Sequence, residues 1–174
     1  RKPASPAFLF RRLRGDGMGA SILSNMLAAS KERYALAVGL DPALSIRELV
    51  SETRRIGARR IAPRVVPASE APVREITLSG DDIDLTRLPA PRFWPGDGGR
   101  YLGTGHVTFI RNPDTGVVNA GVYRQMLHGP RRLGLNIVPG RHGAQNCEAW
   151  WKRGQPCPVV TAYGVDPALF IAAT

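Results

Sequence analysis

The placement of proline limits this chain more than any other feature of its sequence. Pro63, Pro67 and Pro72 stand close together after a stretch with helical patterning. Proline fixes φ, lacks a backbone N–H and disfavours the helical conformation of the residue before it, so this stretch favours an extended linker over a helix. The predicted division is therefore residues 1–62, a linker at residues 63–72, and residues 73–174.

Helical spacing of apolar residues dominates the first region. A loop at residues 16–19 precedes a first predicted helix at residues 22–38, for which Ser21 is a suitable N-cap. A second amphipathic helix takes the apolar positions of residues 46–56 and ends at Gly57. The first region is therefore predicted to be a small helical or α/β segment.

Beyond the linker the patterning changes from helical to β. Residues 73–78 alternate between apolar and polar side chains, which predicts a strand. Two apolar runs flank a turn rich in proline and glycine, which predicts a β-hairpin. The remaining predicted elements, with that hairpin, are strands at residues 106–110, 117–124, 133–138 and 158–163 and helices at residues 143–152 and 167–173. The fold class is α+β, with an antiparallel barrel or sheet and attached helices.

Composition excludes some classes of protein and leaves others open. The chain has 24 Lys and Arg against 14 Asp and Glu, a net charge of +10. Such an excess can mark nucleic-acid binding, but the arginines are dispersed and not interleaved with aromatic residues, which favours a solvated or anion-facing surface. No apolar run reaches the roughly 18 residues of a membrane span. Cys147 and Cys157 form neither a disulfide scaffold nor a zinc motif, which favours structural thiols and a reduced, cytoplasmic compartment.

The second strand of the predicted hairpin carries the first candidate site residues. Its alternation sends three side chains to each face: Asn119, Gly121 and Tyr123, then Ala120, Val122 and Arg124. Gly121 would let a ligand approach the backbone closely. From the spacing alone, the simpler interpretation of Asn119 and Arg124 is an edge-strand amide and a surface arginine, because such residues are seldom buried.

A second cluster, Pro139–Gly143, joins a strand to a predicted helix. Backbone amides at a helix start suit a phosphate group, and His142 suits a divalent metal ion, although a lone histidine is more often structural. An asparagine oxygen together with an imidazole nitrogen would suit manganese. A third cluster, Trp94–Tyr101, is either a tight turn or a loop that lines a site. No dinucleotide fingerprint, P-loop or nucleophile elbow accompanies these clusters.

Taken together, several blocks resemble the UbiD family of decarboxylases. They occur in one order and cover most of the chain, most strongly from about residue 72 onward. The blocks are Ser79–Leu85, Leu88–Pro91, Trp94–Tyr101, Asn112–Gly116, Asn119–Arg124, Pro139–His142 and Gly164–Ala168.

The resemblance implies a fold, a cofactor and a set of site residues. Residues 1–62 would be the end of an N-terminal α/β domain, and residues 73–174 an incomplete split β-barrel, like that of flavin reductases, that binds prenylated FMN with manganese and potassium. Asn119 and His142 would be metal ligands. Arg124 would lie beside the isoalloxazine ring as the catalytic arginine. The other implied cofactor contacts are Ala120, Gly121, Val122, Tyr123, Arg141 and Thr174.

The implied activity is the reversible, non-oxidative decarboxylation of an aromatic, heteroaromatic or α,β-unsaturated carboxylic acid. Relatives are homo-oligomers, dimers or hexamers, and a flavin prenyltransferase supplies their cofactor. The family's third metal ligand and its two catalytic glutamates would follow Thr174, so we expect a fragment that is not catalytically competent alone. The alternatives are a split-barrel protein that binds plain FMN, a nucleic-acid-binding module suggested by charge alone, and a non-catalytic assembly subunit.

Overall fold

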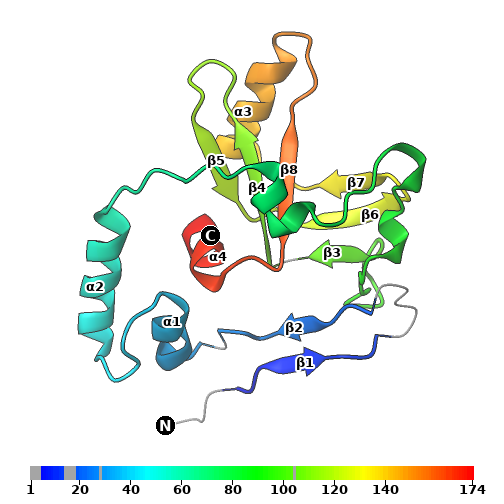
Figure 1. The fold of residues 1–174 in the computed structure, drawn as a ribbon. Coiled ribbons are helices and arrows are strands. Elements are labelled where there is room, and N and C mark those ends of the chain that lie inside the picture. Colours follow the sequence, from blue (N-terminus) through cyan, green and yellow to red (C-terminus); the bar gives the residue numbers. More distant parts are fainter. Residues whose placement is uncertain (1–4, 14–18, 28, 104) are drawn as a thin grey trace. The chain divides into compact units, whose positions relative to one another are not determined.

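A computed structural model describes residues 5–13, 19–27, 29–103 and 105–174 (Figure 1). The chain divides into two compact units, one of residues 1–9 and 23–84 and the other of residues 10–22 and 85–174. Of the loop predicted at residues 16–19, only Gly19 is among the described residues. The domain limits expected from the proline stretch stay predictions.

The first unit contains two helices, α1 (Lys31–Ala37) and α2 (Ile46–Ala58). The helix expected at residues 22–38 is wrong over its first half, because Ile22–Ser24 is a short strand, β2, that pairs with β1 (Phe8–Phe10). Asn25 and Ala29 have φ values of 57° and 52°, a left-handed backbone that a right-handed helix cannot contain. The helix therefore begins only after Ala29.

Both helices begin at a serine whose side chain caps the first turn. Ser30, not Ser21, is the N-cap of α1, and its hydroxyl accepts a hydrogen bond from the backbone N–H of Arg33 at 3.3 Å. Ser45 and Glu48 form a capping box on α2, in which the Ser45 N–H donates to the Glu48 carboxylate at 2.8 Å. This pair satisfies N–H groups that a helix start otherwise leaves unpaired. The second predicted helix is thus confirmed to within two residues of its end.

Short 3₁₀ turns follow α2 in place of a strand. They are η1 (Ala68–Glu70), η2 (Pro72–Arg74), η3 (Gly80–Asp82) and, in the second unit, η4 (Leu85–Arg87). The strand expected at residues 73–78 is wrong. Pro72 begins a turn in which the N–H of Glu75 donates to the Pro72 carbonyl at 3.1 Å, and Val73 and Ile76 stay 86% and 79% exposed. An alternating pattern makes a strand only where a neighbour pairs with it and one face is covered.

The second unit holds two antiparallel sheets of three strands each, in the orders β3-β6-β7 and β5-β4-β8 (Figure 1). Its elements are β3 (Tyr101–Gly103), β4 (His106–Arg111), β5 (Val118–Gly121), β6 (Gln125–Gly129), β7 (Arg132–Leu135), α3 (His142–Trp151), β8 (Val159–Tyr163) and α4 (Pro167–Ala173). The α+β class is confirmed. Pairing among the described strands gives small sheets and closes no barrel.

The predicted hairpin is confirmed as β4 and β5, with Ile110 opposite Asn119 and Thr108 opposite Gly121. Its second strand ends at Gly121, however, and not at Arg124 as expected. Residues 122–124 leave this sheet and lead into β6, which belongs to the other sheet. The simple two-face alternation therefore fails for Val122, Tyr123 and Arg124, because it requires continuous extended pairing.

Side-chain amides and one indole fasten α3 to the end of the hairpin. Asn146 is buried on α3 and donates to the Ile110 carbonyl at 3.0 Å, while its own oxygen accepts from the Asn112 amide at 3.0 Å. Trp150 donates from its indole nitrogen to the Arg111 carbonyl at 2.8 Å. These bonds set α3 against β4 and β5, as Figure 1 shows, so the start of α3 has a defined place near the end of β5.

Candidate cofactor site

Asn119 lies on β5 and is partly buried. Its side-chain nitrogen Nδ2 donates to the hydroxyl oxygen of Tyr123 at 2.8 Å. A partly buried amide that loses water must find partners within the protein, and Tyr123 supplies one of them. The Oδ1 atom of Asn119 is the atom of this amide that can bind a cation.

Tyr123 fits against two glycines from different elements. A Cβ atom on Gly121 of β5 would come within 2.6 Å of the Tyr123 hydroxyl. A Cβ atom on Gly143, in the first turn of α3, would come within 2.8 Å of the ring carbon Cζ. Both distances are shorter than real contacts, so only glycine leaves room for the ring. Gly121 thus admits a close neighbour, which is the chain's own tyrosine, and the expected approach of a ligand stays a prediction.

The start of α3 lacks a side-chain cap and carries basic side chains. Arg141 is the N-cap, its side chain makes no capping bond, and the first turn carries no acidic residue. The side chains of Arg141 and His142 are exposed. The first N–H groups of a helix have no partner within it, and together with the helix dipole they attract anions. This end of α3 is suited to a phosphate group.

Arg124 lies in the connection between the two sheets and its side chain is exposed. Its carbonyl accepts from the N–H of Asn136 at 3.1 Å, and the carbonyl of Tyr123 just before it accepts from Nε2 of His106 at 2.7 Å. The backbone of this connection is thus held by hydrogen bonds at two successive carbonyls, while the Arg124 residue is exposed.

The structure brings some predicted site residues together and leaves others apart. The side chain of Tyr123 contacts Asn119 and Gly121 on β5 and Gly143 in the first turn of α3. Thr174 lies at the end of α4, where its hydroxyl donates to the carbonyl of Ile171 at 2.9 Å. Within the described residues, no three side chains of His, Cys, Asp or Glu are grouped to hold a metal ion. The cation site at Asn119 and His142 stays a prediction.

A buried polar network in the second unit was missed by the sequence reasoning. Gln125 on β6 is only 2% exposed, and its Nε2 donates to the hydroxyls of Thr161 at 2.8 Å and Thr108 at 3.2 Å. Its Oε1 accepts from the Tyr163 hydroxyl. Burial raises the pKa of Tyr163 to about 12. The available signal was a set of polar residues inside otherwise apolar strands, but no local pattern shows that they meet.

His106 on β4 is fully buried beside this network. Its ring lies 5.4 Å from the ring of Tyr163, and Nδ1 has no hydrogen-bond partner among the described residues. Burial lowers the pKa of His106, and the bond from Nε2 to the Tyr123 carbonyl opposes that shift. The imidazole is therefore a neutral donor that holds the backbone of Tyr123.

The Trp94–Tyr101 cluster is a tight turn. The carboxylate of Asp97 accepts from the backbone N–H groups of Phe93 at 3.1 Å and Trp94 at 2.9 Å. The guanidinium group of Arg100 donates to the carbonyl of Ala90 at 2.8 Å. These bonds are sufficient to hold the turn in the absence of a ligand. That the turn also lines a site stays a prediction.

The two cysteines are free thiols in the described structure. Cys147 is buried on α3. The pKa of the Cys157 thiol is raised to about 11, mainly by the burial of Cys157 itself and secondly by the neighbouring Cys147 thiol. A thiol with a raised pKa is a poor nucleophile.

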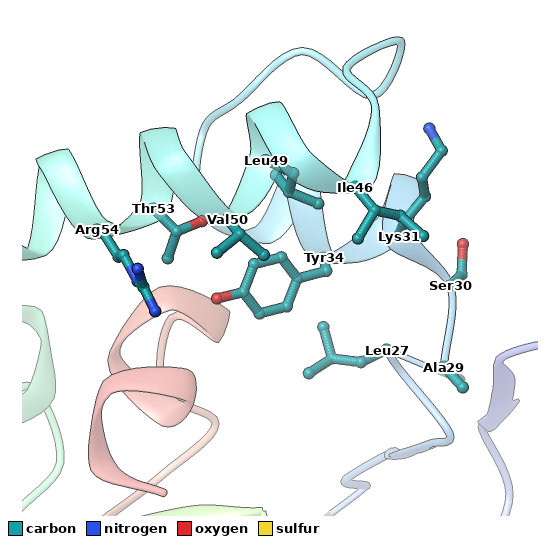
Figure 2. A pocket seen from close by; sticks show the side chains of 10 residues that line it. All are labelled: Leu27, Ala29, Ser30, Lys31, Tyr34, Ile46, Leu49, Val50, Thr53 and Arg54. Atoms are coloured by element: carbon teal, nitrogen blue, oxygen red, sulfur yellow. The ribbon is translucent and has the colours of Figure 1, made fainter.

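A separate cavity of about 590 Å³ lies in the first unit between α1 and α2 (Figure 2). Its walls are mainly apolar, and Figure 2 shows the ring of Tyr34 beside Val50 and Thr53. None of the predicted site residues lines it. Its lining residues are Leu27, Ala29, Ser30, Lys31, Tyr34, Ile46, Leu49, Val50, Thr53 and Arg54.

Solved structures similar to this chain include two aromatic acid decarboxylases and a UbiD-class enzyme. The 3,4-dihydroxybenzoic acid decarboxylase of Klebsiella pneumoniae is 30% identical, with a TM-score of 0.83 over 97% of this chain and 34% of its own. The vanillic acid decarboxylase of Sedimentibacter hydroxybenzoicus is 26% identical, with a TM-score of 0.86 over 97% of this chain and 36% of its own. HmfF of Pelotomaculum thermopropionicum, solved with FMN, is 28% identical, with a TM-score of 0.81 over 92% of this chain and 34% of its own.

The family follows from a direct match of the sequence. Residues 64–174 match the family model described as UbiD, 3-octaprenyl-4-hydroxybenzoate carboxy-lyase Rift-related domain. This chain belongs to the UbiD family, as the blocks of sequence had indicated. It spans about a third of the length of the solved relatives. None of the helices in the described part of the chain has the length and apolar character that a bilayer crossing requires.

Proposed function

We propose that this chain is the cofactor-binding part of a UbiD-type carboxy-lyase that acts on an aromatic, heteroaromatic or α,β-unsaturated carboxylic acid. The observation that carries the proposal is the meeting of Asn119 and the start of α3 at the hydroxyl and ring of Tyr123. One polar side chain and one uncapped helix start therefore face the same small region. A phosphorylated cofactor with a bridging cation requires this combination of groups.

The described residues fit prenylated FMN at its phosphate end. The N–H groups at the start of α3, with the exposed Arg141, would bind the phosphate. Asn119 Oδ1 and the imidazole of His142 would bind manganese, and Thr174 would contact the phosphate or potassium. The backbone of Ala120, Gly121, Val122 and Tyr123 would line the flavin. When bound, the prenylated flavin supplies the electron sink for loss of carbon dioxide.

Arg124 would orient the substrate. Its guanidinium group is exposed at the junction between the two sheets, and its backbone is fixed through Asn136 and Tyr123. A guanidinium group binds a carboxylate with two parallel charge-assisted hydrogen bonds, which fixes both position and orientation. Arg124 would hold the carboxylate of the acid, or the carboxylate of a partner glutamate, beside the flavin ring.

The wider properties of the complete enzyme belong to the same proposal. The two small sheets would be parts of a split β-barrel, and the enzyme would be a cytoplasmic homo-oligomer. HmfF has been solved with prenylated FMN in an evolved dimeric form, which supports both a flavin and self-association here. A flavin prenyltransferase would supply the cofactor.

The test uses the full-length enzyme that contains this chain, produced together with a flavin prenyltransferase. We expect Arg124→Ala to retain the flavin while release of carbon dioxide from 3,4-dihydroxybenzoate or a related acid falls by at least about 100-fold, the scale of losing a charged group that acts in the transition state. His142→Ala should instead lose metal and flavin during dialysis. Arg60→Ala, an exposed arginine of the first unit, is the matched control.

The mass of the flavin extracted from the wild-type enzyme separates the proposal from its main alternative. A mass of plain FMN, with reduction by a nicotinamide and no release of carbon dioxide, would show a split-barrel flavin protein instead. Unchanged turnover in the Arg124→Ala enzyme would contradict the role given to this arginine.

A further inference from the structure

We propose that Tyr123 is a positioning residue that orients the side-chain amide of Asn119 so that its oxygen faces the cation. The inference rests on the proposed function, because that function supplies the cation. Tyr123 itself touches neither the substrate nor the metal in this arrangement. It acts on the metal through Asn119 and through the start of α3.

The first step of the argument is the asymmetry of an amide. An asparagine side chain has one oxygen, which can bind a cation, and one NH₂ group, which cannot. Without a partner the two ends exchange places by rotation about the last side-chain bond, for which two orientations are of similar energy. The bond of 2.8 Å from Nδ2 of Asn119 to the Tyr123 hydroxyl holds one of these orientations, and reversal would require the hydroxyl to turn its own proton toward Oδ1. It places Oδ1 on the side away from Tyr123.

The second step is that the tyrosine ring cannot move to follow the amide. Its ring and hydroxyl occupy the space left by Gly121 on β5 and Gly143 on α3. At the backbone, the Tyr123 carbonyl accepts from Nε2 of the buried His106 at 2.7 Å. The residue is thus held at both ends, and its hydroxyl is a fixed point for Asn119.

The third step links the two proposed metal ligands. Gly143 directly follows His142, and Tyr123 packs against Gly143 in the first turn of α3. The same ring therefore sets the spacing between β5, which carries Asn119, and the helix start, which carries His142. Residues that orient metal ligands without touching the metal typically contribute 10–100-fold to metal affinity.

The experiment compares wild-type protein with Tyr123→Phe, which keeps the ring and removes only the hydroxyl. The probe is Mn²⁺ titrated in the presence of saturating FMN, with free Mn²⁺ followed by electron paramagnetic resonance. We expect Mn²⁺ to bind about 10–100-fold more weakly to Tyr123→Phe. Tyr34→Phe, a tyrosine of the first unit, should bind as wild type does. Unchanged affinity in Tyr123→Phe would overturn the inference.

A second pair of variants separates orientation from packing. Asn119→Asp replaces the amide with a carboxylate, which offers an oxygen in either orientation. Tyr123→Phe should therefore lower Mn²⁺ affinity strongly when position 119 is asparagine and by less than about threefold when Asn119→Asp is also present, a non-additivity that a double-mutant cycle measures. An equal loss in both backgrounds would show a merely structural role and overturn the inference.

A measurement without metal distinguishes failure of the inference from failure of the proposed function. In the apo protein, the Asn119 side-chain NH₂ protons should exchange with water more slowly in wild type than in Tyr123→Phe, as followed by nuclear magnetic resonance. Protected protons in a wild-type protein that binds no Mn²⁺ would support the orienting bond and contradict the proposed function. Equal exchange in the two proteins would overturn the inference even if Mn²⁺ binds.

Discussion

The helices of the first unit and the sheets of the second are held together by different kinds of contact. Ser30 caps α1 from one residue before it, and the capping box of α2 joins Ser45 to Glu48. In the second unit, Gln125 bonds to Thr108 and Thr161, which lie 17 and 36 residues away in the chain. The first set of bonds is local, and the second exists only when three strands have assembled.

This difference indicates how strongly substitutions should change the stability of each unit. The helices of the first unit keep much apolar surface exposed, with Ile46 at 68% and Val50 at 48%, so their contacts there are few. In the second unit, buried polar atoms depend on partners from other strands, and a buried polar group without a partner is costly. We therefore expect large effects in the second unit and small ones in the first.

The largest effect is expected for Gln125→Leu. This change removes the amide and leaves the hydroxyls of Thr108, Thr161 and Tyr163 without it, so we expect the free energy of unfolding to fall by about 3 kcal/mol. Urea denaturation followed by fluorescence measures the change. Gln155→Leu, at an exposed position, should stay within about 0.5 kcal/mol of wild type. Similar losses of unfolding free energy in the two variants would contradict the expectation that the buried amide matters more than the exposed one.

A matched pair of glycine substitutions compares the two units directly. Gly143→Ala places a methyl group against the Tyr123 ring and should lower the free energy of unfolding by about 2 kcal/mol. Gly57→Ala in α2 meets no atom within 4 Å and should raise stability by about 0.5 kcal/mol, because alanine has the higher helix propensity. Thermal unfolding of both variants measures the two signs. A stabilising Gly143→Ala would show that the ring of Tyr123 is free to move.

A smaller effect is expected at the cap of α2. Ser45→Ala removes the hydroxyl that accepts from the Glu48 N–H at 3.3 Å, so stability of this helix should fall by about 1 kcal/mol. Amide hydrogen exchange should show the loss in the first turn of α2, with the second unit unaffected. Ser51→Ala, exposed within the same helix, is the control and should cause no loss. Faster exchange throughout the chain would contradict the local character of the cap.

The smallest effect is a dependence of stability on pH. Burial holds the pKa of His106 below its ordinary value of 6.5. The unfolded chain therefore takes up a proton at a higher pH than the folded one does. The stability that the neutral imidazole contributes is present above about pH 6.5 and is lost as the pH falls toward the folded pKa. His106→Gln should make the denaturation midpoint less dependent on pH between pH 7 and 5. An unchanged slope would show that other groups cause the pH dependence.

Much of the fold could be predicted because its signals are local. The second helix, α3 and α4 were expected within one or two residues of their observed bounds, and the hairpin was expected correctly except that its second strand ends three residues early. The wrong predictions came from patterns without a partner. Apolar alternation at residues 73–78 meets no neighbouring strand and forms a 3₁₀ turn, and helical spacing after residue 22 is interrupted by the left-handed Asn25 and Ala29.

The candidate site was predicted less completely than the fold. The sequence and its resemblance to the UbiD family named Asn119, Tyr123, Arg124 and His142. They did not indicate that the Asn119 amide would donate a hydrogen bond to the Tyr123 hydroxyl. They also missed His106 and Gln125, because a polar residue within a strand looks the same in sequence whether it is buried with partners or exposed to water.

By itself, the sequence determined the starts of α2, α3 and α4, the hairpin and the family, because each depends on residues a few positions apart or on the order of the blocks that resemble the family. Only the tertiary structure decided that two glycines make room for one tyrosine ring between β5 and α3. It also decided that a buried glutamine would bond to hydroxyls from two other strands. Such contacts join residues distant along the chain, so their distances and burial exist only once the sheets and helix have packed.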